Sequence, residues 1–207
     1  MKKILLTMFS ITLLFNLNSY SQSAGDAEKP KVFGIGIEVS KFSWNDIYSN
    51  LSNPVTSLVF TIRTQKNFRL QPVIGFVVQK SNSDFIDADV ISTAMNFGLG
   101  FCGVSWKDKV AITYGLDWNY TLFKDKYKNT GFVDFTLDGN AMKIGPSLGA
   151  EYFFSPNFSF GATTGLKYFT VSNESVDINY NYGYIYSIKE SVSGILFDSS
   201  VLVRIYF

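Results

Sequence analysis

The chain of 207 residues contains no histidine. Imidazole is the side chain that most often moves protons in enzymes, and together with cysteine thiolate it dominates zinc and copper sites. The sequence also has no phosphate-binding P-loop and no dinucleotide-binding glycine motif. We therefore predict no enzyme activity, no cofactor and no metal site.

Cysteine and charge are scarce as well. Cys102 is the single cysteine, so no intrachain disulfide can form, and we expect it to be a small buried residue. Charged residues make up 17% of the chain and the formal net charge is +1, which argues against a nucleic-acid partner. Beyond the first residues no apolar run reaches the roughly 18 residues of a membrane-spanning helix.

The N-terminus has the pattern of a secretory signal peptide. Two lysines precede an apolar stretch over residues 4–15, which is too short to span a bilayer, and small residues then lead to a cleavage site ahead of Gln22. We predict a cleaved signal peptide over residues 1–21 and a flexible polar lead over residues 22–30. An uncleaved membrane anchor is the alternative. The mature chain is expected to leave the cytoplasm.

Aromatic residues and a two-residue alternation are abundant. With 20 Phe and 12 Tyr, the composition favours strands. From residue 31 onward, bulky apolar residues alternate with small or polar ones, as expected for strands with one apolar face. We count eight such strands, joined alternately by long and short connections. The long connections are predicted over residues 43–55, 81–92 and 125–139 and before the last strand. Pro146, on an apolar face, predicts a β-bulge.

These features predict an all-β fold, an eight-stranded antiparallel up-and-down transmembrane β-barrel over residues 31–207, with short periplasmic turns and long extracellular loops. An eight-stranded interior is only wide enough for side chains to fill it, so the glycine-rich face should point inward and the bulky face toward lipid. Aromatic residues near strand ends predict a lower girdle (Phe154, Phe158, Phe160 and Phe207) and an upper one (Trp118, Tyr120 and Tyr168). A soluble barrel, turned inside out, is the alternative.

The chain ends in a strand that stops on an aromatic residue, Val203-Arg204-Ile205-Tyr206-Phe207. With the strand count and loop asymmetry, this ending resembles the small outer-membrane β-barrel family of OmpA/OmpX type, and more closely the PorT-like outer-membrane β-barrel domain proteins of Gram-negative bacteria. The resemblance covers residues 31–207. It implies a place in the cell outer membrane, contact with outer-membrane lipid and lipopolysaccharide, and a closing strand (Val203, Ile205 and Phe207) that the barrel assembly machinery recognises. No catalytic motif of barrel enzymes, which generally need a histidine, is matched.

Charged side chains on the inward face form the candidate lumen network. Opposite charges at matched heights should pair, because an unpaired charge in a low-dielectric lumen is costly. We predict a structural ion-pair plug, with a gated polar path or a catalytic carboxylate pair as the alternative. The candidate residues are Glu38, Arg63, Asp117, Lys143, Glu151, Lys167, Asp198 and Arg204.

Two candidate surfaces lie above the predicted membrane. Tyrosine recurs at every second residue at Tyr180, Tyr182, Tyr184 and Tyr186, which predicts a strand-like hairpin that turns near residues 181–183. It is a candidate extracellular contact surface, or else an extension of the upper girdle. Asp84, Asp87 and Asp89 could meet divalent cations, but they lack calcium-loop spacing, and a solvated acidic loop is predicted.

The function predicted from the sequence is a non-enzymatic outer-membrane barrel protein. It would have a structural or loop-mediated interaction role, a lumen plugged by ion pairs, and an unknown extracellular or periplasmic protein partner. Two alternatives remain open at this point. One is an accessory barrel of a PorT-like protein secretion system, and the other is a narrow passage for small solutes or apolar molecules.

Overall fold

The computed structural model describes residues 32–40, 55–65, 67–83, 88–129, 133–179 and 184–207. The eight strands in this part of the chain are β1 (Phe33–Ser40), β2 (Val55–Gln65), β3 (Phe68–Ser83), β4 (Ala88–Lys107), β5 (Val110–Asn129), β6 (Val133–Ser155), β7 (Phe158–Asn179) and β8 (Tyr184–Tyr206). The predicted signal peptide, 1–21, and the lead, 22–30, lie outside the described residues. Among the described residues there is no helix of the length and apolarity needed to cross a membrane.

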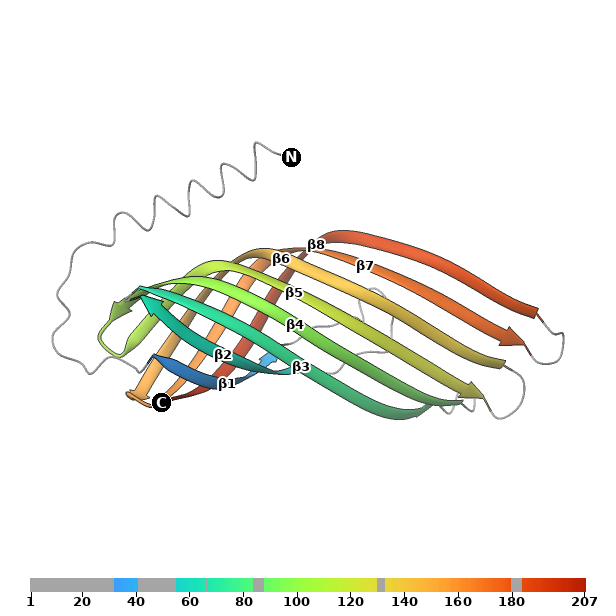
Figure 1. Ribbon diagram of the computed structural model, residues 1–207, viewed down its shortest axis with the longest axis horizontal. Helices are drawn as coiled ribbons and strands as arrows, with labels where there is room; N and C mark the ends of the chain where they lie inside the picture. The colour runs from blue at the N-terminus through green and yellow to red at the C-terminus, as the bar shows by residue number, and fades with distance from the viewer. Residues whose placement is uncertain (1–31, 41–54, 66, 84–87, 130–132, 180–183) are drawn as a thin grey trace, which may run out of the picture.

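Each strand pairs antiparallel with the next, and β1 pairs with β8, so the sheet closes into a ring (Figure 1). The predicted eight-stranded antiparallel barrel is therefore confirmed. At one end, short connections join β2 to β3, β4 to β5 and β6 to β7, and the C-terminal residue lies beside them. There Phe207 N donates to Phe33 O at 2.9 Å. We call this the turn end.

The alternation of side chains separates the outside of the barrel from its inside. Along β8, Phe197 and Ile205 are 73% and 52% exposed, whereas Leu202 and Arg204 are 4% and 3% exposed. Most bulky apolar residues point outward, and small or polar residues fill the lumen above the turn end. A soluble barrel has the opposite arrangement, because its apolar side chains form the core. The residue pattern therefore matches a barrel surrounded by lipid.

At the opposite end, which we call the open end, β3 to β8 extend beyond the ends of β1 and β2 as a projecting sheet (Figure 1). The strands β4 to β8 have 20 to 23 residues, against 8 in β1 and 11 in β2. The predicted loops over residues 81–92 and 125–139, and the long connection predicted before the last strand, were thus wrong in extent, since β7 runs to Asn179 and β8 begins at Tyr184. Their polar composition suggested loops, but a strand surrounded by water can be polar on its outer face and still pair. The strands include residues 81–83, 88–92, 125–129 and 133–139.

The bulge predicted at Pro146 is also wrong. The pairing of β6 with β7 is interrupted at Gly145 and Pro146 and resumes in the same register, as shown by the pairs Ile144↔Tyr168 and Ser147↔Gly165. The proline removes a ladder hydrogen bond without an extra residue, because its ring is accommodated on the outer face. Register shifts occur instead near the turn end, between Arg63 and Gln65 and between Phe153 and Ser155.

Candidate functional site

The lumen is closed at the turn end by an apolar floor. Val104, Ala111, Phe153 and Tyr206 form a buried cluster, with Trp106 packed against it. The ring of Phe153 lies 5.1 Å from that of Trp106 and 5.4 Å from that of Tyr206, between centroids. We did not predict this floor. The sequence contains a signal for it: at the ends of β4 and β6, the positions that face inward change from small to bulky side chains.

Above the floor, Glu151 is the centre of a buried charge cluster. Its Oε2 accepts hydrogen bonds from Arg69 Nη1 at 2.5 Å and from Arg204 Nη1 at 2.9 Å. Its Oε1 accepts from the Tyr206 hydroxyl at 2.7 Å and from Ser159. The side chains of both arginines and of the glutamate are at most 4% exposed. Both carboxylate oxygens are therefore satisfied, which offsets the cost of burying the charge.

Arg69 is the main lumen residue that sequence reasoning missed, because the polar composition of residues 65–69 predicts a turn. In the structure β3 begins at Phe68, and Arg69 shares the inward parity of Gln71. Its guanidinium carbon lies 5.5 Å from the centroid of the Trp106 ring, and that of the predicted network member Arg63 lies 5.6 Å from the same ring. Two guanidinium groups therefore lie against the same indole at the turn end.

Glu38 lies nearer the open end than the Glu151 cluster, at the end of a short chain of hydrogen-bonded hydroxyl groups. Ser200 donates a hydrogen bond to Glu38, and the hydroxyl oxygens of Thr163 and Ser200 lie 2.6 Å apart. A serine hydroxyl has one proton to donate, so Thr163 is the donor in that second contact. Gln71 fills the space nearby. With its amide oxygen toward Arg204, it accepts from Nη1 at 3.2 Å and from Nη2 at 2.6 Å.

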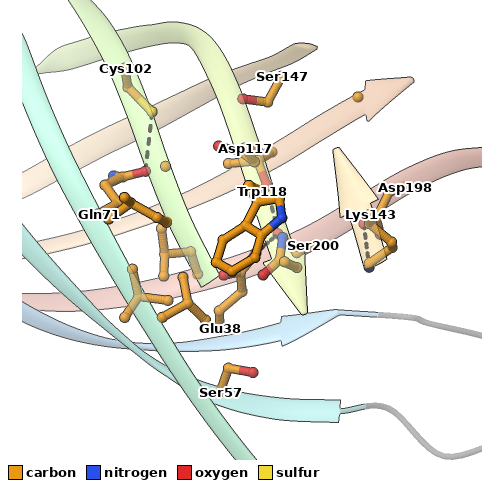
Figure 2. Close-up of a pocket in the computed structure, with 18 of the residues that line it drawn as sticks. Glu38, Ser57, Gln71, Cys102, Asp117, Trp118, Lys143, Ser147, Asp198 and Ser200 are labelled. Carbon is orange, nitrogen blue, oxygen red and sulfur yellow. Dashed lines mark hydrogen bonds and ion pairs between the residues drawn. The ribbon is translucent and has the colours of Figure 1, made fainter. Parts of the chain in front are cut away.

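Two lysine–aspartate pairs lie in the lumen nearer the open end. Lys167 of β7 donates to Asp117 of β5 at 2.8 Å and to the Gly145 carbonyl at 3.1 Å. Lys143 of β6 donates to Asp198 of β8 at 2.8 Å (Figure 2). Each pair joins two strands that flank a third, so it lies over the inner face of the strand between them, and Lys167 bonds the backbone of that strand. The Lys167 side chain is 5% exposed.

Between the Glu151 cluster and these pairs is a small polar cavity of about 80 Å³. Glu38, Gln71, Asp117, Lys143 and Asp198 are among its lining residues (Figure 2). A binding pocket for a drug-sized ligand usually measures about 300–1,000 Å³, and a water molecule takes about 30 Å³ of liquid. The cavity thus has room for a few water molecules and none for a sugar or a peptide.

Inward glycines on β1 make room for the large lumen side chains. A Cβ at Gly34 would lie 2.7 Å from Cδ1 of Tyr206, and one at Gly36 would lie 2.5 Å from Cγ of Arg204 and 2.6 Å from the Val203 carbonyl oxygen. The close approach is therefore to a neighbouring strand as well as to a side chain. Cys102 is buried on the same inner surface and is 3% exposed.

Polarity inverts along the projecting sheet. On β8 the lumen face continues through Tyr186, Ile188, Glu190 and Val192, and the three apolar residues among them are 63%, 41% and 37% exposed. Exposed polar residues such as Lys189 lie on the outer face, where this lysine pairs with Glu174 at 3.3 Å. The outer face is thus built for water above the lipid-facing belt. Exposed aromatic and apolar side chains on a curved face are typical of contact surfaces.

Several predicted surface residues lie outside the described structure, namely Tyr180, Tyr182, Asp84 and Asp87 and the side chain of Tyr184. Asp89 is described and pairs with Lys80 at 3.2 Å, with both side chains exposed. In the described residues no group of three or more histidine, cysteine or acidic side chains could hold a metal ion.

The predicted girdle residues lie on the outer surface. Phe154, Phe158, Phe160, Phe207, Trp118 and Tyr168 are exposed, and Tyr120 is partly exposed. At the turn end the ring of Phe207 lies 6.4 Å from that of Phe33, and Phe154 lies 5.6 Å from Phe158. Trp118 and Tyr120 stack at 6.4 Å. Val203 and Ile205 of the closing strand also face outward, and their role in assembly stays a prediction.

No protein-family model and no curated protein matches the chain. Among solved structures it is similar to a major outer membrane protein from Thermus thermophilus, with a TM-score of 0.56, 11% identity, and 83% of this chain and 98% of that chain covered. It also matches Acinetobacter baumannii CarO, with a TM-score of 0.38, 12% identity and coverage of 84% and 97%. At such identities the likeness shows the fold alone, and the OmpA/OmpX and PorT-like resemblance stays a prediction. The chain has the fold of an outer-membrane β-barrel protein.

Proposed function

We propose that the protein is a non-enzymatic, non-conducting outer-membrane barrel that anchors its projecting sheet at the cell surface for contact with an external partner. The observation that carries this proposal is the cross-bracing of the lumen. Glu151 of β6 ties Arg69 of β3 to Arg204 of β8 across the bore, directly above the apolar floor. An ion passing through would have to break this cluster and then displace packed aromatic rings.

A conducting pore needs a continuous polar path along which an ion binds weakly enough to leave. Here the charges hold one another at 2.5 to 2.9 Å, in a bore with little free volume. Opening the path would separate buried opposite charges, which costs several kcal/mol for each pair broken. The lumen charges are therefore assigned to stability.

The same contacts argue against catalysis. A general base needs a carboxylate with a free lone pair facing substrate. Both oxygens of Glu151 already accept hydrogen bonds, and Asp117 and Asp198 each meet a lysine. The cavity beside them admits only water-sized molecules.

The surface role is supported by the polarity inversion on β8. Tyr186, Ile188 and Val192 present exposed apolar area on the face that continues the lumen, while the outer face is polar. Tyrosine provides a large contact area with few rotatable bonds, so ordering it on binding costs little entropy. A rigid barrel below and an exposed apolar face above suit a protein that displays a contact surface.

The test is single-channel recording in planar lipid bilayers. The purified wild-type barrel should give no steady conductance steps. The variant Arg69→Ala/Glu151→Ala/Arg204→Ala/Phe153→Ala, which removes the charge cluster and also opens the apolar floor, should show openings and serves as the positive control. Steady wild-type steps of porin size would refute the proposal and favour the passage alternative.

A further inference from the structure

A groove crosses the outer wall of the barrel, on the lipid-facing side and away from the lumen. It has a volume of about 600 Å³ and runs from β5 through β6, β7 and β8 to β1. One row of its lining residues can be followed by register, since each residue is the direct partner of the next: Val39↔Val201, Val201↔Ala162, Ala162↔Ala150 and Ala150↔Ile112. With strands about 4.8 Å apart, the row is about 19 Å long.

In the next row toward the open end, the side chains on two strands, β7 and β8, are also small. Leu148 pairs with Thr164, and Thr164 pairs with Ser199. The two rows are two residues apart along each strand, about 6.7 Å. The floor of the groove is therefore built from Ala150, Ala162, Thr164 and Ser199, in a belt whose other outward residues are mostly large.

Bulky rows bound the groove on both sides. Toward the turn end, Tyr152 pairs with Phe160, and they are 44% and 46% exposed. Toward the open end, Leu166 pairs with Phe197, and they are 53% and 73% exposed. The ladder between β7 and β8 is regular throughout, and that between β6 and β7 is regular from Ser147 to Phe153, so the depression comes from side-chain size and not from a break in the sheet.

We propose that this groove holds one acyl chain of a membrane phospholipid in a fixed position across the strands. The groove is continuous with the lipid-facing belt, so hydrocarbon chains are what surround it in the membrane. It is long, narrow and free of charged side chains, which suits a chain and excludes a headgroup. The groove lies on the outer side of the wall, and the charged residues of the lumen lie on its inner side, with residues 163, 164, 199 and 200 lining both cavities.

The driving force is packing. Lipid tails are as apolar as the wall, so transfer from bilayer to groove brings no hydrophobic gain. A chain lying in the groove contacts the floor and both rims, whereas a chain passing over it would leave a gap that forfeits dispersion energy. The hydroxyl of Thr164 donates to the Asp198 carbonyl at 3.2 Å and needs no polar group from the ligand. The Ser199 hydroxyl faces hydrocarbon whether or not an acyl chain is held in the groove, so it neither favours nor opposes binding of the chain.

The test counts immobilised lipid chains. Wild type is reconstituted in dimyristoylphosphatidylcholine vesicles that contain phosphatidylcholine spin-labelled near the chain end, and electron paramagnetic resonance gives the number of motionally restricted chains per barrel. The variant Ala150→Phe/Ala162→Phe fills the groove and should restrict about one chain fewer than wild type. The matched control Ile74→Phe, on the outer face of β3, should restrict the same number as wild type.

Equal numbers in all three proteins would overturn the proposal. So would a wild-type dimer, seen by native mass spectrometry, that becomes monomeric in the filled variant, because the groove would then be an interface between two copies. Correct insertion is checked by heat-modifiable migration on gels. If the double variant does not insert, Ala162→Leu replaces it, and an unchanged number of restricted chains in that variant would equally overturn the proposal.

Discussion

Replacing Glu151 by glutamine should strongly destabilise the barrel. Glutamine keeps the size of the side chain but loses the charge, and one of its two acceptor positions becomes a donor. The amide nitrogen would then face either the two arginines or the Tyr206 and Ser159 hydroxyls, all of which donate to Glu151 in the wild type. The substitution leaves two buried guanidinium groups, Arg69 and Arg204, without their shared counter-charge.

The magnitude follows from the burial of the cluster. Removing one partner of a buried ion pair costs about 3–5 kcal/mol, because the other charge stays buried and unpaired. Here one carboxylate is the shared counter-charge of two arginines whose side chains are 2% and 3% exposed. We therefore expect Glu151→Gln to lower the free energy of unfolding by about 4–5 kcal/mol.

Urea unfolding from detergent micelles, followed by tryptophan fluorescence, measures this effect. Trp106 reports on the cluster directly, since the Arg69 guanidinium lies 5.5 Å from its ring. A background with Trp44→Phe and Trp118→Phe leaves Trp106 as the only fluorophore of the three tryptophans. The transition midpoint and slope together give the free energy of unfolding.

The matched control is Asp138→Asn, which breaks the Lys124–Asp138 pair, whose side chains are 43% and 52% exposed. A surface pair contributes under about 1 kcal/mol, so this variant should unfold almost as the wild type does. Adding Arg69→Met and Arg204→Met to Glu151→Leu should recover much of the loss, because no unpaired charge remains within the Glu151 cluster. If Glu151→Gln lowered the free energy of unfolding no more than Asp138→Asn does, the stabilising role assigned to the buried cluster would be wrong.

Three further predictions concern assembly and orientation. Gly36→Val should block folding, seen as loss of the heat-modifiable gel shift, since its Cβ would lie 2.5 Å from a β8 side chain, whereas Gly194→Ala, whose nearest contact is an aromatic ring edge at 3.0 Å, should fold. Deleting Phe207 should reduce insertion in cells but leave refolding into micelles largely intact, and equal membrane levels would contradict this. A membrane-impermeant maleimide should label Ser191→Cys on intact cells and leave Asp108→Cys at the turn end unlabelled, and the reverse result would invert the proposed orientation.

The strand count and the two faces of the wall could be predicted from the sequence alone. Side chains alternate across a strand with a period of two, so a run such as Ile195, Phe197, Val201 and Val203 identifies its lipid face without any knowledge of its neighbours. Bulky residues on that face and glycine on the other then decide which side is the lumen, because an eight-stranded bore has little space. The same parity placed Glu38, Glu151 and Arg204 inside.

Only the tertiary structure decided which charges meet. Glu151 finds Arg69 and Arg204 because β3, β6 and β8 bring them to one height across the bore, and that height depends on the registers of all the intervening strands. The alternation of side chains along one strand contains no information about which residues lie opposite it two or three strands away around the barrel. Strand length above the lipid belt was likewise decided by pairing with neighbours, since in water a polar strand and a polar loop have similar compositions.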